Sequence, residues 1–399
     1  MKNPATKLAF AALLATALPL SAAFAQGSQP IRIGSLMPMT GPASGVGVTH
    51  TIGSGMAVKE INAAGGIMGR QIQIITADDQ GDPTQAVSEA KRLVFQEKVD
   101  LLLGPLLSGL VIATAPVLTE AKIASIHSGA STAITTQLLP YGFSMFTSVD
   151  EQAKSMVNYA ANAKVKSAAI LTDNGALSKA VHEPMREGLK ARGITLTGLQ
   201  EHDMRSTDIT PQILALRRTN PDIILYIVTT GEDAGLAVKT LNDIGWDVPI
   251  VSPTFSNVTG PVLKIAGPDV FKGGKVIGQT YKTYTYCPGD AVGGSAFAKF
   301  LAKLKTAEPV NYERIGLLNV SWLYDGVYIY KAAIEGTKST EGPKVAAWIE
   351  DNVAKLNDRI SGRLAASKTS HFLIGADALE MVSRSDVRRE DGMVQRAGC

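Results

Sequence analysis

The chain has 399 residues, of which 45% are hydrophobic and 19% are charged, and its formal net charge is +3 at pH 7. This length exceeds one core of ordinary size, so we expect two domains. The small net charge, and the lack of a basic stripe with interleaved aromatic residues, exclude a nucleic-acid-binding protein.

The N-terminus predicts export. Lys2 and Lys7 precede the apolar run LAFAALLATALPLSAAF, and Ala23, Phe24 and Ala25 form an A-x-A cleavage pattern. These features are typical of a cleavable signal peptide, which we place at residues 1–25. No later stretch reaches the roughly 18 apolar residues of a membrane span. We therefore expect a soluble mature protein in the periplasm.

Short apolar strands alternate with helical patterns from Ile31 onward. This pattern favours a parallel sheet covered on both faces. The predicted strands are 31–36, 71–77, 99–104 and 123–126, and the predicted helices are 46–62, 83–96 and 108–121.

A second strand–helix series begins after Asp150 and predicts a second α/β lobe. Its strands are expected at 167–172, 194–199, 222–228 and 248–252, and its helices at 177–192, 209–219 and 232–244. Beyond it we expect a strand at 274–279, helices at 297–305 and 314–335, and strands at 371–375 and 378–382.

Three predicted strands end in small polar residues. Ser108 and Gly109 follow the first of them, His127 to Thr132 follow the second, and Thr229, Thr230 and Gly231 follow the third. In an open α/β sheet, ligands bind beyond the carboxyl ends of strands, where helices begin. Hydroxyl groups and free backbone N–H groups at helix starts suit a carboxylate. The same residues also serve as helix caps and turns, and we expect Ser108 to cap its helix.

Enzyme and metal motifs are missing. The stretch GVGVTH begins like a dinucleotide fingerprint, but His50 stands where the third glycine belongs. His127 could act as a base for Ser108 in a hydrolase, yet no acidic partner is placed beside it. The scattered histidines and two cysteines predict no metal site. Cys287 and Cys399 could form a disulfide in an oxidising compartment or remain free thiols, and the sequence leaves both open.

Three stretches resemble the leucine/isoleucine/valine-type solute-binding proteins of ABC importers. They are TGPASGVG (40–47), AVKEINAAGGIMGRQIQIITADDQGDPTQAV (57–87) and VDLLLGPLLSGLVIATAPVLTEAKI (99–123). The resemblance implies two doubly wound parallel-sheet lobes joined by three hinge segments, with the ligand in the cleft. It places residues 28–148 and 279–355 in lobe 1, and 149–278 and 356–399 in lobe 2. It also implies a monomer without cofactor or catalytic activity, with a membrane permease as its partner.

The resemblance also implies roles for individual residues. Ser108 matches the serine that binds the ligand carboxylate, and Gly129, Ala130 and Ser131 match the backbone and hydroxyl groups that assist it. Thr254 stands where amino-acid binders carry an acidic residue, and Leu177 and Thr230 stand where they carry aromatic residues. Gly81 and Leu107 replace a short disulfide of the family. Leu107, Phe255 of the second lobe, and Tyr281, which we expect near the cleft, complete the predicted ligand-binding set.

The resemblance leaves two ligand classes open. Without an acidic residue at position 254, an amine-free aromatic or aliphatic acid is favoured, because a buried ammonium group without a partner is costly. Glu232 or Asp233 could substitute, which keeps leucine, isoleucine, valine or another amino acid as the alternative. A ligand sensor with the same fold and a serine hydrolase are further alternatives.

Overall fold

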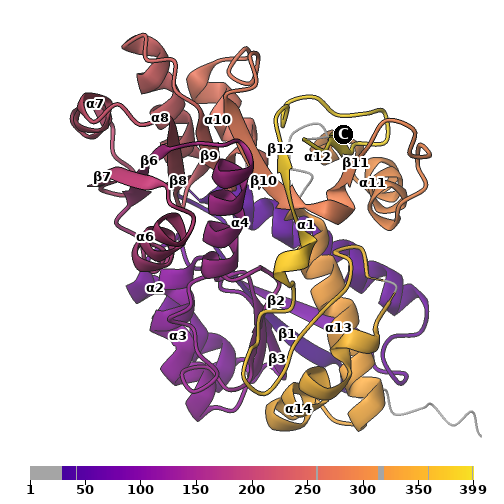
Figure 1. The fold of residues 1–399 in the computed structure, drawn as a ribbon. Coiled ribbons are helices and arrows are strands. Elements are labelled where there is room, and N and C mark those ends of the chain that lie inside the picture. The colour runs from indigo at the N-terminus through magenta and orange to yellow at the C-terminus, as the bar shows by residue number, and fades with distance from the viewer. Residues whose placement is uncertain (1–28, 42, 258, 313–318, 358, 398) are drawn as a thin grey trace, which may run out of the picture.

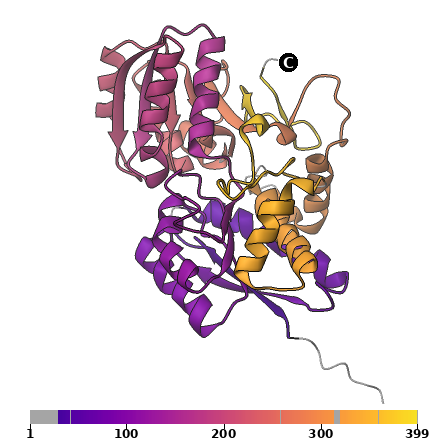
Figure 2. The ribbon, with the colours of Figure 1, turned by 60° about the horizontal axis from the view of Figure 1, so that its bottom comes forward.

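A computed structural model describes residues 29–41, 43–257, 259–312, 319–357, 359–397 and 399, so the predicted signal peptide lies outside the described residues. Two α/β lobes lie one above the other in Figures 1 and 2. Each lobe holds a mainly parallel sheet with helices on both faces, and the predicted fold class is therefore confirmed.

The first sheet has the order β2-β1-β3-β4-β5, and all its neighbouring strands are parallel. Its strands are β1 (Ile31–Met37), β2 (Ile72–Asp78), β3 (Leu101–Leu103), β4 (Ala124–His127) and β5 (Gly142–Ser144). One face packs against α1 (Ser44–Ala63), α13 (Ser321–Thr337) and α14 (Gly342–Asn352), and the other against α2 (Pro83–Lys91), the π-helix η1 (Arg92–Gln96) and α3 (Ser108–Glu120). Burial on both faces explains the uniformly apolar sequence of β3.

The second sheet has the order β12-β10-β9-β8-β6-β7, and only β12 is antiparallel to its neighbour. Its strands are β6 (Ser167–Asp173), β7 (Thr195–His202), β8 (Ile223–Ile227), β9 (Ile250–Ser252), β10 (Val276–Tyr281) and β12 (Leu379–Val382). The helices of this lobe are α4 (Val149–Asn162), α5 (Ala176–Lys179), α6 (His182–Ala191), α7 (Thr210–Arg218), α8 (Gly231–Asp243), α9 (Thr254–Asn257) and α10 (Thr259–Ala266).

Several predicted elements need correction. The helix expected at 177–192 is two helices, α5 and α6, and Pro184 lies in the first turn of the second, where its missing N–H is tolerated. The strand expected at 371–375 makes only isolated bridges, one of them from Phe372 to Ser144 of β5. The sequence prediction missed β5, α4, α10 and α14. The expected helix 314–335 is described from Ser321 onward, and its start lies outside the described residues.

The chain passes between the lobes three times: after β5, after β10, and ahead of β12. Two details differ from the predicted boundaries. Strand β10 continues past residue 278 to Tyr281 within the second sheet. Leu364, Leu373 and Ile374 belong to the core cluster of the first lobe, although the predicted boundary assigns them to the second.

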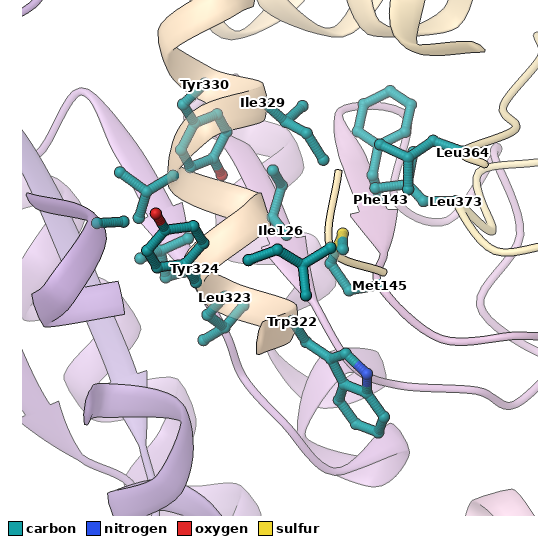
Figure 3. Close-up of a cluster of buried hydrophobic side chains, with 14 of the residues drawn as sticks. Ile126, Phe143, Met145, Trp322, Leu323, Tyr324, Ile329, Tyr330, Leu364 and Leu373 are labelled. Carbon is teal, nitrogen blue, oxygen red and sulfur yellow. The ribbon is translucent and has the colours of Figure 1, made fainter. Parts of the chain in front are cut away.

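Helix α13 forms the centre of the first-lobe core. Figure 3 shows Leu323 and Tyr330 of this helix directed toward the sheet, close to Ile126. The hydroxyl of Tyr330 donates to the carbonyl oxygen of Leu102 at 2.5 Å, which joins the helix to β3. Helix α1 approaches the start of α13 so closely that a Cβ at Gly53 would lie 1.9 Å from the carbonyl oxygen of Val320. Only glycine fits at this crossing.

The C-terminal segment folds back onto the second crossing. Strand β13 (Val394–Gln395) pairs with β11 (Thr285–Tyr286), beside α11 (Ala296–Ala307) and α12 (Pro309–Tyr312). Cys287 and Cys399 form a disulfide across a sequence separation of 112 residues, which resolves the alternative that the sequence left open. The guanidinium group of Arg389 lies 4.1 Å from the ring centre of Tyr286, a cation–π contact that also holds this segment.

No helix in the described part of the chain combines the length and apolar character needed to cross a membrane.

Candidate functional site

A cavity lies between the two lobes, at the carboxyl ends of the parallel strands. It encloses about 700 Å³ of empty space, its open mouth included. The lining residues are Val46, Leu106, Leu107, Ser108, Ser128, Ala130, Phe146, Gln152, Leu177, Ile227, Val228, Thr229, Pro253, Thr254, Asn257, Asn319 and Trp322. No charged side chain of a described residue is among them. The cavity suits a small, mainly apolar molecule with a few polar groups.

Ser108 lies at the start of α3, at the first-lobe wall of the cavity. Its Oγ accepts hydrogen bonds from the backbone N–H groups of Ala130 at 3.0 Å and Ser131 at 3.2 Å. Leu107 is the N-cap of α3 and no side chain caps this helix, so the expectation that Ser108 is the cap is wrong. Because its oxygen already accepts two hydrogen bonds, the Ser108 hydroxyl is free to donate its proton into the cavity. Two accepted bonds polarise the hydroxyl and strengthen it as a donor.

The start of α3 adds a positive electrostatic potential to this wall. The backbone N–H groups of Ser108 and Gly109 have no hydrogen-bond partner among the described residues. Such groups at the N-terminus of a 13-residue helix carry the positive end of its dipole. The polarised hydroxyl and the helix start together form a site that favours an anion and uses no lysine or arginine.

The residues after β4 support Ser108. Ala130 lines the cavity, whereas Gly129 and Ser131 are buried and do not. The N–H of Gly129 donates to Nδ1 of His127 at 3.1 Å, and its carbonyl oxygen accepts from Ser144 at 2.8 Å. This stretch holds Ser108 in place with its backbone, and Ser128 and Ala130 present surface to a ligand.

Only some of the residues predicted for the second-lobe wall line the cavity. Leu177 and Thr254 line the cavity, and the Thr254 hydroxyl donates to the carbonyl oxygen of Val228 at 2.9 Å. Thr230 lies outside the lining and caps α8 by accepting from the N–H of Asp233. The neighbouring Thr229 lines the cavity instead. Phe255 is fully buried in the second-lobe core.

Tyr281 lies at the hinge rather than on the cavity wall. It ends β10, is 2% exposed, and belongs to the first-lobe core cluster. Its hydroxyl accepts from the backbone N–H of Thr147 at 3.1 Å, which links the first crossing to the second. Its ring packs edge-on against Phe146 and Trp322, both of which line the cavity. Tyr281 therefore contacts the wall from behind.

Sequence reasoning missed four polar lining residues. They are Gln152, Asn257, Asn319 and Trp322, and all are at least nine-tenths buried. Asn257 ends α9, Asn319 precedes α13, and Trp322 lies in the first turn of α13, so no strand-end pattern indicates them. The amide nitrogen of Asn319 donates to the carbonyl oxygen of Asn257 at 2.9 Å, a contact between elements of the two lobes.

Two buried acidic residues of the second lobe, Asp233 and Asp173, form hydrogen bonds within the protein. Asp233 is 1% exposed and accepts from the Thr230 hydroxyl at 2.8 Å and from the N–H of Arg205 at 3.0 Å. Asp173 is fully buried and accepts from the N–H groups of Gly175 and Thr229. Neither these carboxylates nor that of Glu232 lines the cavity.

His127 is not arranged as a catalytic base. Burial and the nearby His371 lower its pKa to about 3, so the ring is neutral. Because Nδ1 accepts from Gly129, the proton is on Nε2, which has no partner among the described residues. A serine nucleophile needs a base within hydrogen-bond reach and a group that orients the base. Ser108 makes no hydrogen bond to His127, which argues against a hydrolase. The described residues also contain no group of three potential metal ligands.

The buried histidines give a pH-dependent test. Burial lowers the pKa of His50 to about 4, and that of His127 lies near 3. Between pH 6.5 and 4 the unfolded chain therefore takes up protons that the folded chain refuses, and acidification destabilises the protein. Burial raises the pKa of Asp79 and Asp325 to about 6. Between pH 6 and about 4 these two groups are therefore protonated in the folded chain but not in the unfolded chain, which opposes the loss of stability caused by the histidines.

The double variant His50→Gln/His127→Gln lacks the two buried histidines and keeps the two carboxyl groups that oppose them, Asp79 and Asp325. Its free energy of unfolding should rise, relative to the unmodified protein, by a few kcal/mol as the pH falls from 6 to 4, at about 1.4 kcal/mol per pKa unit per histidine. Urea unfolding at pH 6, 5 and 4 measures the difference. Parallel pH profiles for the two proteins would contradict the assignment of neutral buried histidines.

Two parallel-sheet lobes, three crossings and a cavity at the facing strand ends define a two-lobed ligand-binding protein. A family model described as periplasmic binding protein matches residues 30–379, and the chain belongs to this family. The family consists of binding proteins, not enzymes.

Curated relatives are similar in sequence. The Leu/Ile/Val-binding protein BraC3 of Rhizobium johnstonii is 30% identical over 60% of this chain and 65% of its own length. An amino acid binding protein of Pseudomonas aeruginosa is 26% identical over 80% of this chain and 82% of its own length. The chain thus spans just under two thirds of the first of these relatives.

Solved structures share the fold. The isoleucine complex of LivJ, a branched-chain amino acid transporter substrate-binding protein of Streptococcus pneumoniae, has a TM-score of 0.75 and 24% identity, covering 92% of this chain and 97% of that one. A solute-binding protein of Rhodopseudomonas palustris in complex with 4-hydroxybenzoate has a TM-score of 0.74 and 18% identity, covering 92% and 95%. At these identities the likeness establishes the fold alone.

Proposed function

We propose that this protein is the periplasmic substrate-binding component of an ABC importer of the branched-chain-amino-acid type. The cavity binds a small carboxylate, the lobes close over it, and a membrane permease receives it. The protein acts as a monomer and needs no cofactor. Family membership and the signal-like N-terminus support this role.

The ligand is an aromatic or aliphatic acid without an amine. The observation that carries this choice is the uneven charge of the cavity wall. Ser108 and the start of α3 favour an anion on one side, while no carboxylate of a described residue lines the cavity to hold an ammonium group. An ammonium group buried without a partner costs several kcal/mol.

The second candidate is an amino acid, as in the Leu/Ile/Val-binding relatives and the isoleucine complex. A thermal-shift screen followed by calorimetry distinguishes the two, with leucine, isoleucine and valine on one side and benzoate, hydroxybenzoates and hexanoate on the other. Micromolar binding of an amino acid, with no comparable amine-free acid, would reject the proposed ligand class.

A charge placed at position 254 tests the same point. We expect Thr254→Glu to raise the affinity for leucine relative to the amine-free acid by about tenfold or more, which corresponds to about 1.4 kcal/mol. The new carboxylate pairs with an ammonium group and adds repulsion to a second anionic group. Calorimetry measures both affinities, and Thr254→Gln, of similar size without the charge, is the control. An equal shift in both variants would show that size rather than charge is responsible.

A further inference from the structure

Three buried polar groups at one part of the cavity wall have no hydrogen-bond partner in the described chain. They are Oδ1 of Asn257, Oδ1 of Asn319 and Nε1 of Trp322. The three residues are 8%, 4% and 2% exposed, and all line the cavity. Buried polar groups are nearly always hydrogen-bonded, so such a cluster beside a cavity points to groups supplied by a ligand.

The orientation of two of these groups is fixed by their contacts. The amide nitrogen of Asn319 donates to the carbonyl oxygen of Asn257, so Oδ1 of Asn319 is left as an acceptor. A flipped amide would set two oxygens against each other. The indole of Trp322 extends away from the helix in Figure 3, and Phe146 packs edge-on against it with ring centres 4.5 Å apart. Its Nε1–H can only donate.

Asn319 lies two residues ahead of the first residue of α13, Trp322 is the second residue of that helix, and both side chains line the same cavity. Among the described residues, this part of the wall therefore offers an acceptor and a donor without a charged group. A carbonyl oxygen would satisfy only the indole, and an ammonium group only the amide. A hydroxyl group both donates and accepts, and it satisfies both from a single atom.

We propose that Asn319 and Trp322, assisted by Asn257, bind a hydroxyl group of the ligand. The inference rests on the proposed function, in which the ligand carboxylate lies at Ser108. The ligand is then a hydroxylated acid, and these residues select it over the same acid without the hydroxyl. A site built to hydrogen-bond a hydroxyl discriminates strongly against the analogue that lacks it, because its own polar groups stay unpaired.

Calorimetry with matched acids tests the selection. The pairs are benzoate against 3- and 4-hydroxybenzoate, and hexanoate against 6-hydroxyhexanoate. In the unmodified protein we expect at least one hydroxylated acid to bind more tightly, by about tenfold or more, than the matched acid without the hydroxyl.

Two variants locate the effect, and each has a control on α14. Trp322→Phe removes the N–H and keeps a ring, and Trp348→Phe is the same change away from the cavity. Asn319→Leu removes the amide at similar size, and Asn352→Leu is its control. In both cavity variants, the ratio of the affinities of the hydroxylated and the hydroxyl-free acid should approach one. The affinity for the acid without the hydroxyl should change little. The two controls should keep the ratio of the unmodified protein.

The outcomes separate the two proposals. Binding of the acids without any preference for the hydroxyl overturns this inference and leaves the proposed function standing. A preference that survives both Trp322→Phe and Asn319→Leu also overturns it. Binding of neither member of any pair, with an amino acid bound instead, rejects the proposed ligand class and this inference with it. Should Asn319→Leu fail to fold, Trp322→Phe decides alone.

Discussion

Replacing Ser108 with alanine should lower the affinity for the carboxylate ligand by about ten- to a hundredfold, or about 1.5–3 kcal/mol. The variant loses the hydroxyl that we expect to donate to the anion. It also leaves the N–H groups of Ala130 and Ser131 without their acceptor in a buried place. Leaving such groups unpaired should lower the ligand-free stability by about 1–3 kcal/mol.

Ser128→Ala is the matched control for this experiment. Ser128 lines the same cavity, but its hydroxyl donates to the carbonyl oxygen of Leu106 at 3.1 Å and is thus already used. Calorimetry should find its affinity close to that of the unmodified protein, while urea unfolding measures the stability of both variants. A folded Ser108→Ala variant with unchanged affinity would remove Ser108 from the binding site.

The double variant Cys287→Ser/Cys399→Ser should lose about 2–5 kcal/mol of stability. The bond closes a long loop, because the cysteines are 112 residues apart, and it restricts the unfolded chain accordingly. Other contacts still hold the segment: the pairing of β11 with β13, the cation–π contact of Arg389, and the hydrogen bond from the N–H of Ala397 to the carbonyl oxygen of Met381. We therefore expect a folded variant.

Urea unfolding under oxidising and reducing conditions measures this contribution. A reductant should destabilise the unmodified protein and leave the double variant unchanged. If the unmodified protein and the double variant were equally stable under oxidising conditions, the noncovalent contacts of the C-terminal segment would suffice without the disulfide.

The strand–helix alternation was readable from the sequence because each strand of the parallel sheets is a short apolar run. The helix predicted from Pro83 does begin there, because α2 starts at Pro83, and the structure adds a cap from the side chain of Asp82. Other elements were missed for different reasons: β5 has only three residues, and the proline in the first turn of α14 was not taken as a helix start. Pro184 is the sequence signal for a new helix start at α6, but the whole stretch was predicted as one helix.

The first-lobe side of the site was predictable for a simple reason. Ser108 and Ala130 lie directly after parallel strands, whose carboxyl ends meet at one edge. Trp322 of α13 and Asn319 just ahead of that helix reach the same cavity from a part of the chain that follows β10, and only the packing of α13 brings them there. Phe255 and Tyr281 illustrate the opposite case, since an aromatic residue near a strand end can equally complete a core.

The position of α13 in the chain also affects how the protein is made. The strands of the first sheet lie within residues 31–144, but α13 and α14, which cover much of one face, span residues 321–352. A growing chain therefore exposes Leu101, Leu103 and Ile126 while the whole run from β6 to β10 is synthesised. Contacts so distant in sequence form slowly, and uncovered apolar strands attract chaperones and aggregate. Late closure of the first lobe favours a loosely folded growing chain, which is the state that the export proposed above requires.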